Sequence, residues 1–432
     1  MTLAADLLLM AAAPLLFRPE DFGCTPDGRT LCTAGIRKAI ASCPASGCVV
    51  DFAGPGTYLT QTFNLTSNLE LRIGPNATIL GTSEDRYNLE HAGGDWPVLP
   101  YAEYPSLPTR DVNPAYQAVI RGYNLTNVTI VAQPGGMLDC GGTYWICQGY
   151  GDATKAAGFC GEPTTPGPYC LHPPCNASCG LPAADHKAGP CPQPWSRPSG
   201  TTPTRPRCVH LVGTEHIRIT NLTMRNSPFW NLHFQFSSDV VVDGVQIYQF
   251  PGAANADGID IDSTRDVVVK NTMVDSNDDM LCVKSGANWL GRQAGVPSEN
   301  IIFQDCEIRS VRLHACLPVP PCHPPAASIP QLTVRWHASS QGHGLTLGSE
   351  MSGGVRNVTY RNIKYNSSAS CTNADPRDCG GPKYKGHSFP GGAHFKTQRG
   401  ACCARVVSLC CCCYDHQVVT HDLAHRARRI PD

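Results

Sequence analysis

The chain has 432 residues, a formal net charge of −1 and only 16% charged residues. This near-neutral balance argues against a nucleic acid as its partner, because binding to phosphates needs a surplus of positive charge. The 41 glycines and 37 prolines predict many turns and few long helices.

The cysteine content points to an oxidising compartment. Cytosolic chains rarely carry 24 cysteines. Eight N-x-[ST] sequons agree with this: Asn64, Asn76, Asn124, Asn127, Asn176, Asn221, Asn357 and Asn366. An apolar run over residues 7–17 resembles that of a signal peptide, so residues 1–19 are expected to form a leader. The run is preceded by Asp6, and no basic residue lies before it. The run is too short to span a bilayer. We expect a secreted, extracellular or cell-wall protein without a membrane partner.

A repeat dominates the rest of the chain. After a short helix over residues 33–42 and short strands from Asn68 onwards, five similar strand–turn–strand segments begin at His216, Asp239, Asp266, Asn300 and Asn357. The first four starts follow one another at similar intervals, and only the last interval is much longer. Such a unit at such intervals is typical of a parallel β-solenoid, whereas a β-sandwich would require hairpin turns between antiparallel strands. The sequence therefore predicts an all-β parallel solenoid.

Two segments interrupt the pattern and a third ends it. Residues 143–207 are rich in Pro, Gly and Cys and are expected to form a disulfide-linked loop on the solenoid; a zinc site is the alternative, although no CxxC pair is present. Residues 311–340 are Pro-rich, and without them the long last interval would match the others, which indicates an insertion. Residues 401–432 contain Cys410–Cys413 without a strand pattern. We therefore expect one domain over residues 20–400 and a tail outside it.

Three carboxylates are candidates for chemistry: Asp257, Asp278 and Asp279. One repeat interval separates the first from the adjacent pair, and the β-branched run DVVVKNTMV between them predicts a strand. Parallel strands stack about 4.8 Å apart, so one turn of a solenoid would return the pair beside Asp257. Like charges held this close raise at least one pKa, which creates a proton donor beside a base. The structural alternative is that each Asp caps a turn, which explains an adjacent pair poorly.

Four motifs then suggest a family. Asn255-Ala256-Asp257, Asn277-Asp278-Asp279, Gly342-His343-Gly344 and His394-Phe395-Lys396 resemble, in order, the N-T-D, [GQ]-D-D, G-H-G and R-I-K motifs of glycoside hydrolase family 28, the polygalacturonases. The likeness covers residues 21–142 and 207–400. It implies a single-stranded, right-handed parallel β-helix of the pectin lyase-like type, and inverting hydrolysis of α-1,4-galacturonosyl linkages in pectin.

The resemblance also implies a role for each motif residue. Asp278 would be the general acid, and Asp257 and Asp279 would hold and deprotonate the attacking water. His343 would tune the protonation of the acid or contact the substrate, and Lys396 would pair with a substrate carboxylate. The residues expected on the substrate-binding side are Asn255, His394 and Lys396. Two positions depart from the family motifs, with Ala256 in place of Thr and His394 in place of Arg.

By the same resemblance, neither a metal nor an organic cofactor is expected. The partner would be an acidic polysaccharide such as pectin or polygalacturonate, and the protein would be a monomer. Two other functions remain open: a catalytically inactive pectin-binding β-helix, and a pectate lyase, which uses calcium and a basic catalytic residue. The presence of all three acids argues against the first, and the G-H-G and N-A-D motifs argue against the second.

Overall fold

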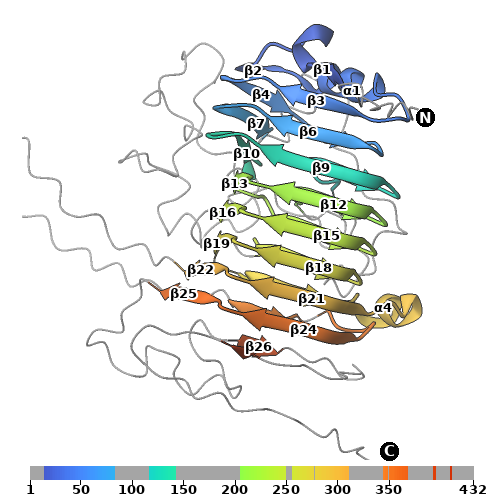
Figure 1. Ribbon diagram of the computed structural model, residues 1–432, viewed down its shortest axis with the longest axis vertical. Helices are drawn as coiled ribbons and strands as arrows, with labels where there is room; N and C mark the ends of the chain where they lie inside the picture. Colours follow the sequence, from blue (N-terminus) through green and yellow to red (C-terminus); the bar gives the residue numbers. More distant parts are fainter. Residues whose placement is uncertain are drawn as a thin grey trace, which may run out of the picture.

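Three parallel β-sheets run along the molecule and form the walls of a β-helix (Figure 1). The computed structural model describes residues 14–82, 116–142, 205–249, 255–276, 278–310, 344–348, 350–367, 393–395 and 409–410. Each full coil contributes one strand to each sheet, and the N-terminal coils (blue) lie at one end of the stack while β24 and β25 (orange) lie towards the other. The predicted all-β parallel β-helix is confirmed.

The described strands fall into three sheets. Sheet A contains β1 (Leu15–Phe17), β3 (Cys48–Phe52), β6 (Leu69–Ile73), β9 (Thr126–Ala132), β12 (Glu215–Thr220), β15 (Ser238–Asp243), β18 (Arg265–Lys270), β21 (Ser298–Gln304), β24 (Val355–Arg361) and β27 (Leu409–Cys410). Sheet B contains β2 (Asp27–Leu31), β4 (Gly56–Thr60), β7 (Ala77–Gly81), β10 (Met137–Asp139), β13 (Thr223–Arg225), β16 (Gln246–Tyr248), β19 (Met273–Asp275), β22 (Glu307–Ser310) and β25 (Lys364–Ser367). Sheet C contains β5 (Phe63–Asn64), β8 (Ile120–Tyr123), β11 (Val209–Val212), β14 (Leu232–Gln235), β17 (Ile259–Asp262), β20 (Leu281–Lys284), β23 (Leu345–Leu347) and β26 (Ala393–Phe395).

Helices are few and short in the described residues. The 3₁₀ helix η1 (Pro19–Phe22) precedes α1 (Thr33–Ala41), which agrees with the helix expected over residues 33–42. A second α-helix, α4 (Asn288–Ala294), was not predicted; it ends at Gly295 in the left-handed conformation that favours glycine. None of the described helices has the length and apolar character that a membrane crossing requires.

The sequence repeat corresponds to the strands of sheets A and B. Each of the five repeated segments supplies one strand to sheet A and the next to sheet B, for example β15 and β16. Alternate residues face the core, so Val240, Val267, Ile301 and Val358 stack in register inside the helix. Stacking identical positions buries an apolar column that no single coil could bury alone.

A ladder of Asn and Asp residues explains why these residues begin so many segments. Asp239, Asp266, Asn300 and Asn357 all adopt positive φ angles between 51° and 59° at the start of sheet A. Asn and Asp tolerate this left-handed conformation better than other non-glycine residues. The Asn300 side-chain amide donates to Asp266 at 2.9 Å, and that of Asn357 donates to Asn300 at 2.7 Å. The ladder therefore repeats the same turn from coil to coil.

The long connections all lie at one corner of the coil, between sheet B and sheet C. This is where the chain passes from β7 to β8, from β10 to β11 and from β22 to β23. The segments expected to be insertions, residues 143–207 and 311–340, belong to the last two of these connections. Nearly all of their residues lie outside the described ones, but the flanking strands keep their register, since β10 pairs with β13 and β21 with β24.

Disulfide bonds stabilise the N-terminal coils and close one connection. Cys24 bonds Cys32, and Cys43 bonds Cys48, on either side of α1. Cys140 bonds Cys208, which joins the two ends of the connection that contains residues 143–204.

Strands are also present in the two terminal ranges. Strand β1 lies inside the range expected as a leader and pairs with β3, and β27 lies inside the expected tail and pairs with β24.

Deleting residues 311–340 is expected to leave the β-helix intact and to raise its melting temperature and soluble yield. Residues 341–344 would then connect β22 with β23, much as residues 276–280 connect β19 with β20. Shortening the connection recovers loop-closure entropy of up to about 2 kcal/mol. Circular dichroism and thermal melting of the deletion variant and the parent measure the effect. A lower melting temperature or lost β signal would show that the segment is an integral structural element.

Candidate active site

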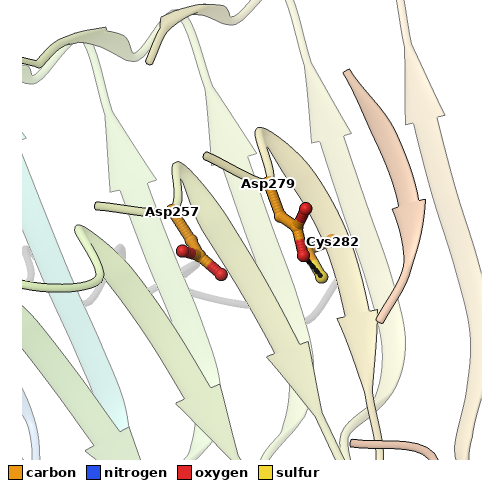
Figure 2. A group of neighbouring side chains, drawn as sticks. All are labelled: Asp257, Asp279 and Cys282. Atoms are coloured by element: carbon orange, nitrogen blue, oxygen red, sulfur yellow. Dashed lines mark hydrogen bonds between the residues drawn. The ribbon is translucent and has the colours of Figure 1, made fainter. Parts of the chain in front are cut away.

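Asp257 and Asp279 lie side by side on successive coils (Figure 2). Each is two residues before a strand of sheet C, and β17 pairs with β20 so that Ile259 faces Leu281. The Gly258 backbone N–H donates to the Asp279 carbonyl at 2.8 Å, which fixes the two chain segments against each other. Both side chains are buried, at 2% and 1% exposure. The expected return of the second acid beside the first after one turn is therefore present in the structure.

Asp278 occupies a more exposed position at the same edge. Its Oδ2 accepts a hydrogen bond from the Asn255 backbone N–H at 2.6 Å, and its Oδ1 accepts one from the Asp279 N–H at 3.0 Å. The side chain is partly exposed, unlike those of the two neighbouring acids. Of the four sequence motifs, the structure thus joins the first and second directly, through Asn255 and Asp278.

Lys284 is a member of this cluster that sequence reasoning missed. It ends β20, and its Nζ lies 3.2 Å from Asp257 Oδ2, 3.4 Å from Asp260 Oδ1 and 3.0 Å from Glu350 Oε2. The side chain is only 2% exposed. Strand alternation could have placed Asp260 and Lys284 on one face of sheet C, but the long stretch of chain between Lys284 and Glu350 gave no local signal.

The electrostatics of the acids follow from their burial. Burial raises the pKa of Asp257 well above its usual range; the negative charges of Asp260, Asp278 and Asp279 add to this, while the Lys284 ammonium opposes it. Burial raises the pKa of Asp260 to about 7, again against the effect of Lys284. Burial disfavours the charged form of Lys284, but its acidic neighbours outweigh this and hold its pKa well above the usual value. One buried cation is therefore shared among several carboxyl groups.

A buried group of aromatic and imidazole rings adjoins the acids on the N-terminal side. The Trp230 ring centroid lies 4.4 Å from Lys284 Nζ and 4.6 Å from the Arg207 guanidinium. His233 packs edge-on against Trp230 at 4.9 Å and stacks on His210 at 4.4 Å. Burial depresses the pKa of both histidines well below the ordinary value, so both rings are neutral and add no charge next to the acids.

The remaining predicted residues belong to the next coils of the same sheet. In strand register, Asp260 aligns with Cys282, Cys282 with Thr346, and Thr346 with His394. The backbone of His394 therefore lies in the same row of sheet C as Asp260. His343 and Lys396 lie outside the described residues, as does Asn277; Gly344, which follows His343, accepts a hydrogen bond from the Leu281 N–H at 3.0 Å.

The site also contains a group of donor atoms close enough to consider for metal binding. Ligand atoms of Asp257, Asp279 and Cys282 lie within 4.8 Å of one another (Figure 2). The Cys282 thiol donates to Asp279 Oδ2 at 3.8 Å, and burial raises its pKa well above the usual value, so the sulfur is a neutral donor. Lys284 already supplies a positive charge against Asp257. The arrangement is that of a buried acid cluster balanced by a protein ammonium group.

Known proteins with similar sequences point to one family. Residues 188–309 match the model described as glycosyl hydrolases family 28. A probable polygalacturonase of Vitis vinifera is 26% identical over 348 residues, which cover 79% of this chain and 53% of that protein. An exo-poly-alpha-D-galacturonosidase of Dickeya chrysanthemi is 27% identical over 296 residues, covering 67% and 45%. The chain thus spans about half the length of these curated relatives.

Solved structures show the same fold. A hyperthermoactive exopolygalacturonase from Thermotoga maritima matches with a TM-score of 0.55 and 22% identity, over 82% of this chain and 68% of that one. A family 28 exopolygalacturonase from Yersinia enterocolitica matches with a TM-score of 0.52 and 17% identity, over 93% and 61%. The family model and the sequence relatives confirm the resemblance to glycoside hydrolase family 28 that the motifs suggested.

Replacing Asp260 by Asn is expected to flatten the dependence of stability on pH. Burial raises the pKa of Asp260 in the folded chain to about 7, above the ordinary value of 3.8. Protonated Asp260 therefore stabilises the folded chain. Its contribution to the free energy of unfolding is complete below about pH 4. That contribution is lost as pH rises through 7, by at most about 1.4 kcal/mol per pH unit. Melting temperatures measured from pH 4 to 8 should therefore fall less steeply in Asp260→Asn than in the parent. Asp266→Asn removes an exposed carboxylate and is the control; equal slopes in all three proteins would contradict the assignment.

Proposed function

We propose that this chain, a relative of the family 28 glycosyl hydrolases, hydrolyses α-1,4-galacturonosyl linkages of pectic polysaccharides with inversion of configuration. The observation that carries the proposal is the arrangement of the three acids. Asp257 and Asp279 are buried side by side, and the partly exposed Asp278 adjoins them. The likeness of the chain to polygalacturonases supports pectin as the substrate class.

In this proposal Asp278 is the general acid. Inverting glycosidases protonate the leaving oxygen with one carboxylic acid while a second carboxylate activates a water molecule. Asp278 is the member of the trio with partial exposure, and so the one best able to reach a glycosidic oxygen. The N–H groups of Asn255 and Asp279 donate to its oxygens. These hydrogen bonds hold the Asp278 carboxyl group in a fixed position beside the other two acids.

Asp257 and Asp279 hold and deprotonate the attacking water. Their buried carboxyl groups lie next to each other, and the raised pKa of Asp257 strengthens it as a base once it is ionised. Asp257 Oδ1 has no hydrogen-bond partner in the described structure, whereas Oδ2 pairs with Lys284. The unpaired oxygen is therefore the acceptor that we assign to the water.

The remaining motif residues recognise the substrate. Lys396 pairs with a galacturonate carboxylate, and His394 stands at the position of the family's Arg. His343 tunes the acid or contacts the sugar. Asn255 is assigned to the substrate-binding side by its place in the first motif, and its backbone N–H holds Asp278. No cofactor is required in this proposal.

The three described disulfides and the sequons support secretion. We propose an extracellular or cell-wall location for a monomeric enzyme.

Asp278→Asn should abolish hydrolysis without unfolding the chain. The amide keeps the shape of the carboxyl group but cannot deliver its proton, so kcat on polygalacturonate should fall by about 10²–10⁴-fold. Release of reducing sugar measures the loss, circular dichroism checks the fold, and Asp266→Asn, at an exposed position of sheet A, is the matched control. Activity at the parental level in Asp278→Asn would overturn its assignment as the acid.

The first product released should carry the inverted anomeric configuration. An inverting site leaves room for a water between acid and base, so no covalent sugar intermediate forms. Proton NMR of the initial product distinguishes the two anomers. A retained anomer would contradict the mechanism. Unsaturated product that disappears on calcium chelation would identify a lyase instead, and binding to polygalacturonate without turnover would identify an inactive pectin-binding protein.

A further inference from the structure

We propose that Lys284 is a positioning residue for the reaction: its buried ammonium group, anchored by Glu350 of the following coil, favours the ionised form of Asp257 and holds one oxygen of that carboxylate, so that the other faces the attacking water. This inference rests on the proposed function, because it assigns Asp257 as a base. It concerns a residue outside the four sequence motifs.

The geometry of Lys284 is unusual for a lysine at the end of a strand. In register it faces Asp262 of β17, but its Nζ contacts Asp257 and Asp260 nearer the start of that strand. The side chain therefore runs back along the outer face of sheet C instead of entering solvent. The Trp230 ring covers the ammonium group at 4.4 Å. Excluding water in this way strengthens the attraction between the ammonium and the carboxylates.

Glu350 fixes the other side of the ammonium group. Its Oε2 accepts a hydrogen bond from Lys284 Nζ at 3.0 Å, and its carbonyl accepts one from the Ser285 N–H at 2.6 Å. Glu350 is thus tied by both backbone and side chain to the end of β20. The lysine spans two coil interfaces, from Asp257 on one neighbouring coil to Glu350 on the other. A group held in this way has little freedom to leave Asp257.

The charge balance gives this contact its consequence. One ammonium group faces Asp257, Asp260 and Glu350, and ionising every buried acid would be costly. Burial raises the pKa of both aspartates, which disfavours the ionised form that a base needs. Lys284 is the counter-charge in direct contact with both. Without it, the pKa of Asp257 would rise further, and less of the protein would carry the ionised base that accepts a proton from water.

Other charged or titratable groups face the cluster from several elements. Arg207, which precedes β11, lowers the pKa of Asp260, and Asp278 and Asp279 raise that of Asp257. His233 of β14 is held neutral by burial, and its Nε2 lies 3.2 Å from Asp262.

Two neutral groups complete these surroundings. Burial raises the pKa of the Cys282 thiol on β20 and of the Tyr360 hydroxyl on β24 well above their ordinary values. Neither group carries charge near neutral pH. Lys284 therefore remains the described cation placed to set the charge of Asp257 directly.

The test compares the pH dependence of kcat in three variants acting on polygalacturonate. Lys284→Met removes the charge and keeps the length, so kcat at pH 5 should fall at least about tenfold and the acidic limb of the profile should move up by about one pH unit or more. Glu350→Gln removes an anion that shares Lys284, so its acidic limb should move to lower pH. Lys270→Met, at a half-exposed lysine paired with Asp243 on sheet A, is the control and should match the parent.

Opposite displacement of the acidic limb in the first two variants supports the proposal, since a merely structural role would lower the yield of folded protein without moving the limb. An unchanged limb in both variants would overturn it. If Lys284→Met does not fold, Glu350→Gln alone decides: a limb displaced to lower pH supports the proposal and an unchanged or raised limb opposes it.

A second measurement does not need activity. Removing the ammonium raises the pKa values of Asp257 and Asp260 further in the folded chain, so Lys284→Met should lose stability relative to the parent as pH rises through about 7 and above, where Asp260 ionises in the folded parent but stays protonated in the variant. A melting-temperature difference that widens with pH supports the proposal, and one that is constant opposes it. If the parent shows no hydrolysis while the difference still widens, the proposed function has failed but the control of Asp257 by Lys284 has not.

Discussion

The in-register stacking of parallel coils is the constraint on which the site depends. Hydrogen bonds run from Asn231 N–H to the Asp257 carbonyl, from Gly258 N–H to Asp279, and from Leu281 N–H to Gly344. This ladder brings residues that are one full coil apart in sequence to within one strand spacing in space. Two acids at equivalent positions of successive coils must therefore be neighbours, whatever their charge, and the apolar columns inside the helix supply the free energy that holds them there.

That constraint has an electrostatic cost, which explains the rest of the cluster. Carboxyl groups forced together in a buried place resist ionisation. Lys284 offsets part of the cost and Glu350 in turn holds Lys284, so the pairing extends over three coils. The cluster lies at the corner between sheet B and sheet C, which is also where the long connections of the chain enter. The corner can thus vary in sequence and length while the strand register that positions the acids is kept through the stack.

The sequence was sufficient to predict the β-helix and the pairing of Asp257 with Asp279, because both follow from a strand repeat whose first four segments start at similar intervals. It was not sufficient for Lys284. In the strand LCVK a terminal lysine is more commonly a solvated charge, and its partner Glu350 lies beyond the connection that contains residues 311–343. The strands of sheet C also escaped the repeat, since their outward positions hold His233, Asp260 and Cys282 in place of a recurring residue type.

The departure of the first motif from the family pattern can also be understood physically. Ala256 is fully buried, and its carbonyl accepts hydrogen bonds from Ser276 Oγ at 2.6 Å and from the Asn231 amide at 3.4 Å. These contacts use the backbone, so they do not depend on which small side chain occupies position 256. The Asn231 amide also binds the Asp257 carbonyl at 2.9 Å. Asp257 is therefore placed by the main chain, whereas the ionisation of its carboxyl group depends on burial, on the neighbouring acids and on the opposing charge of Lys284.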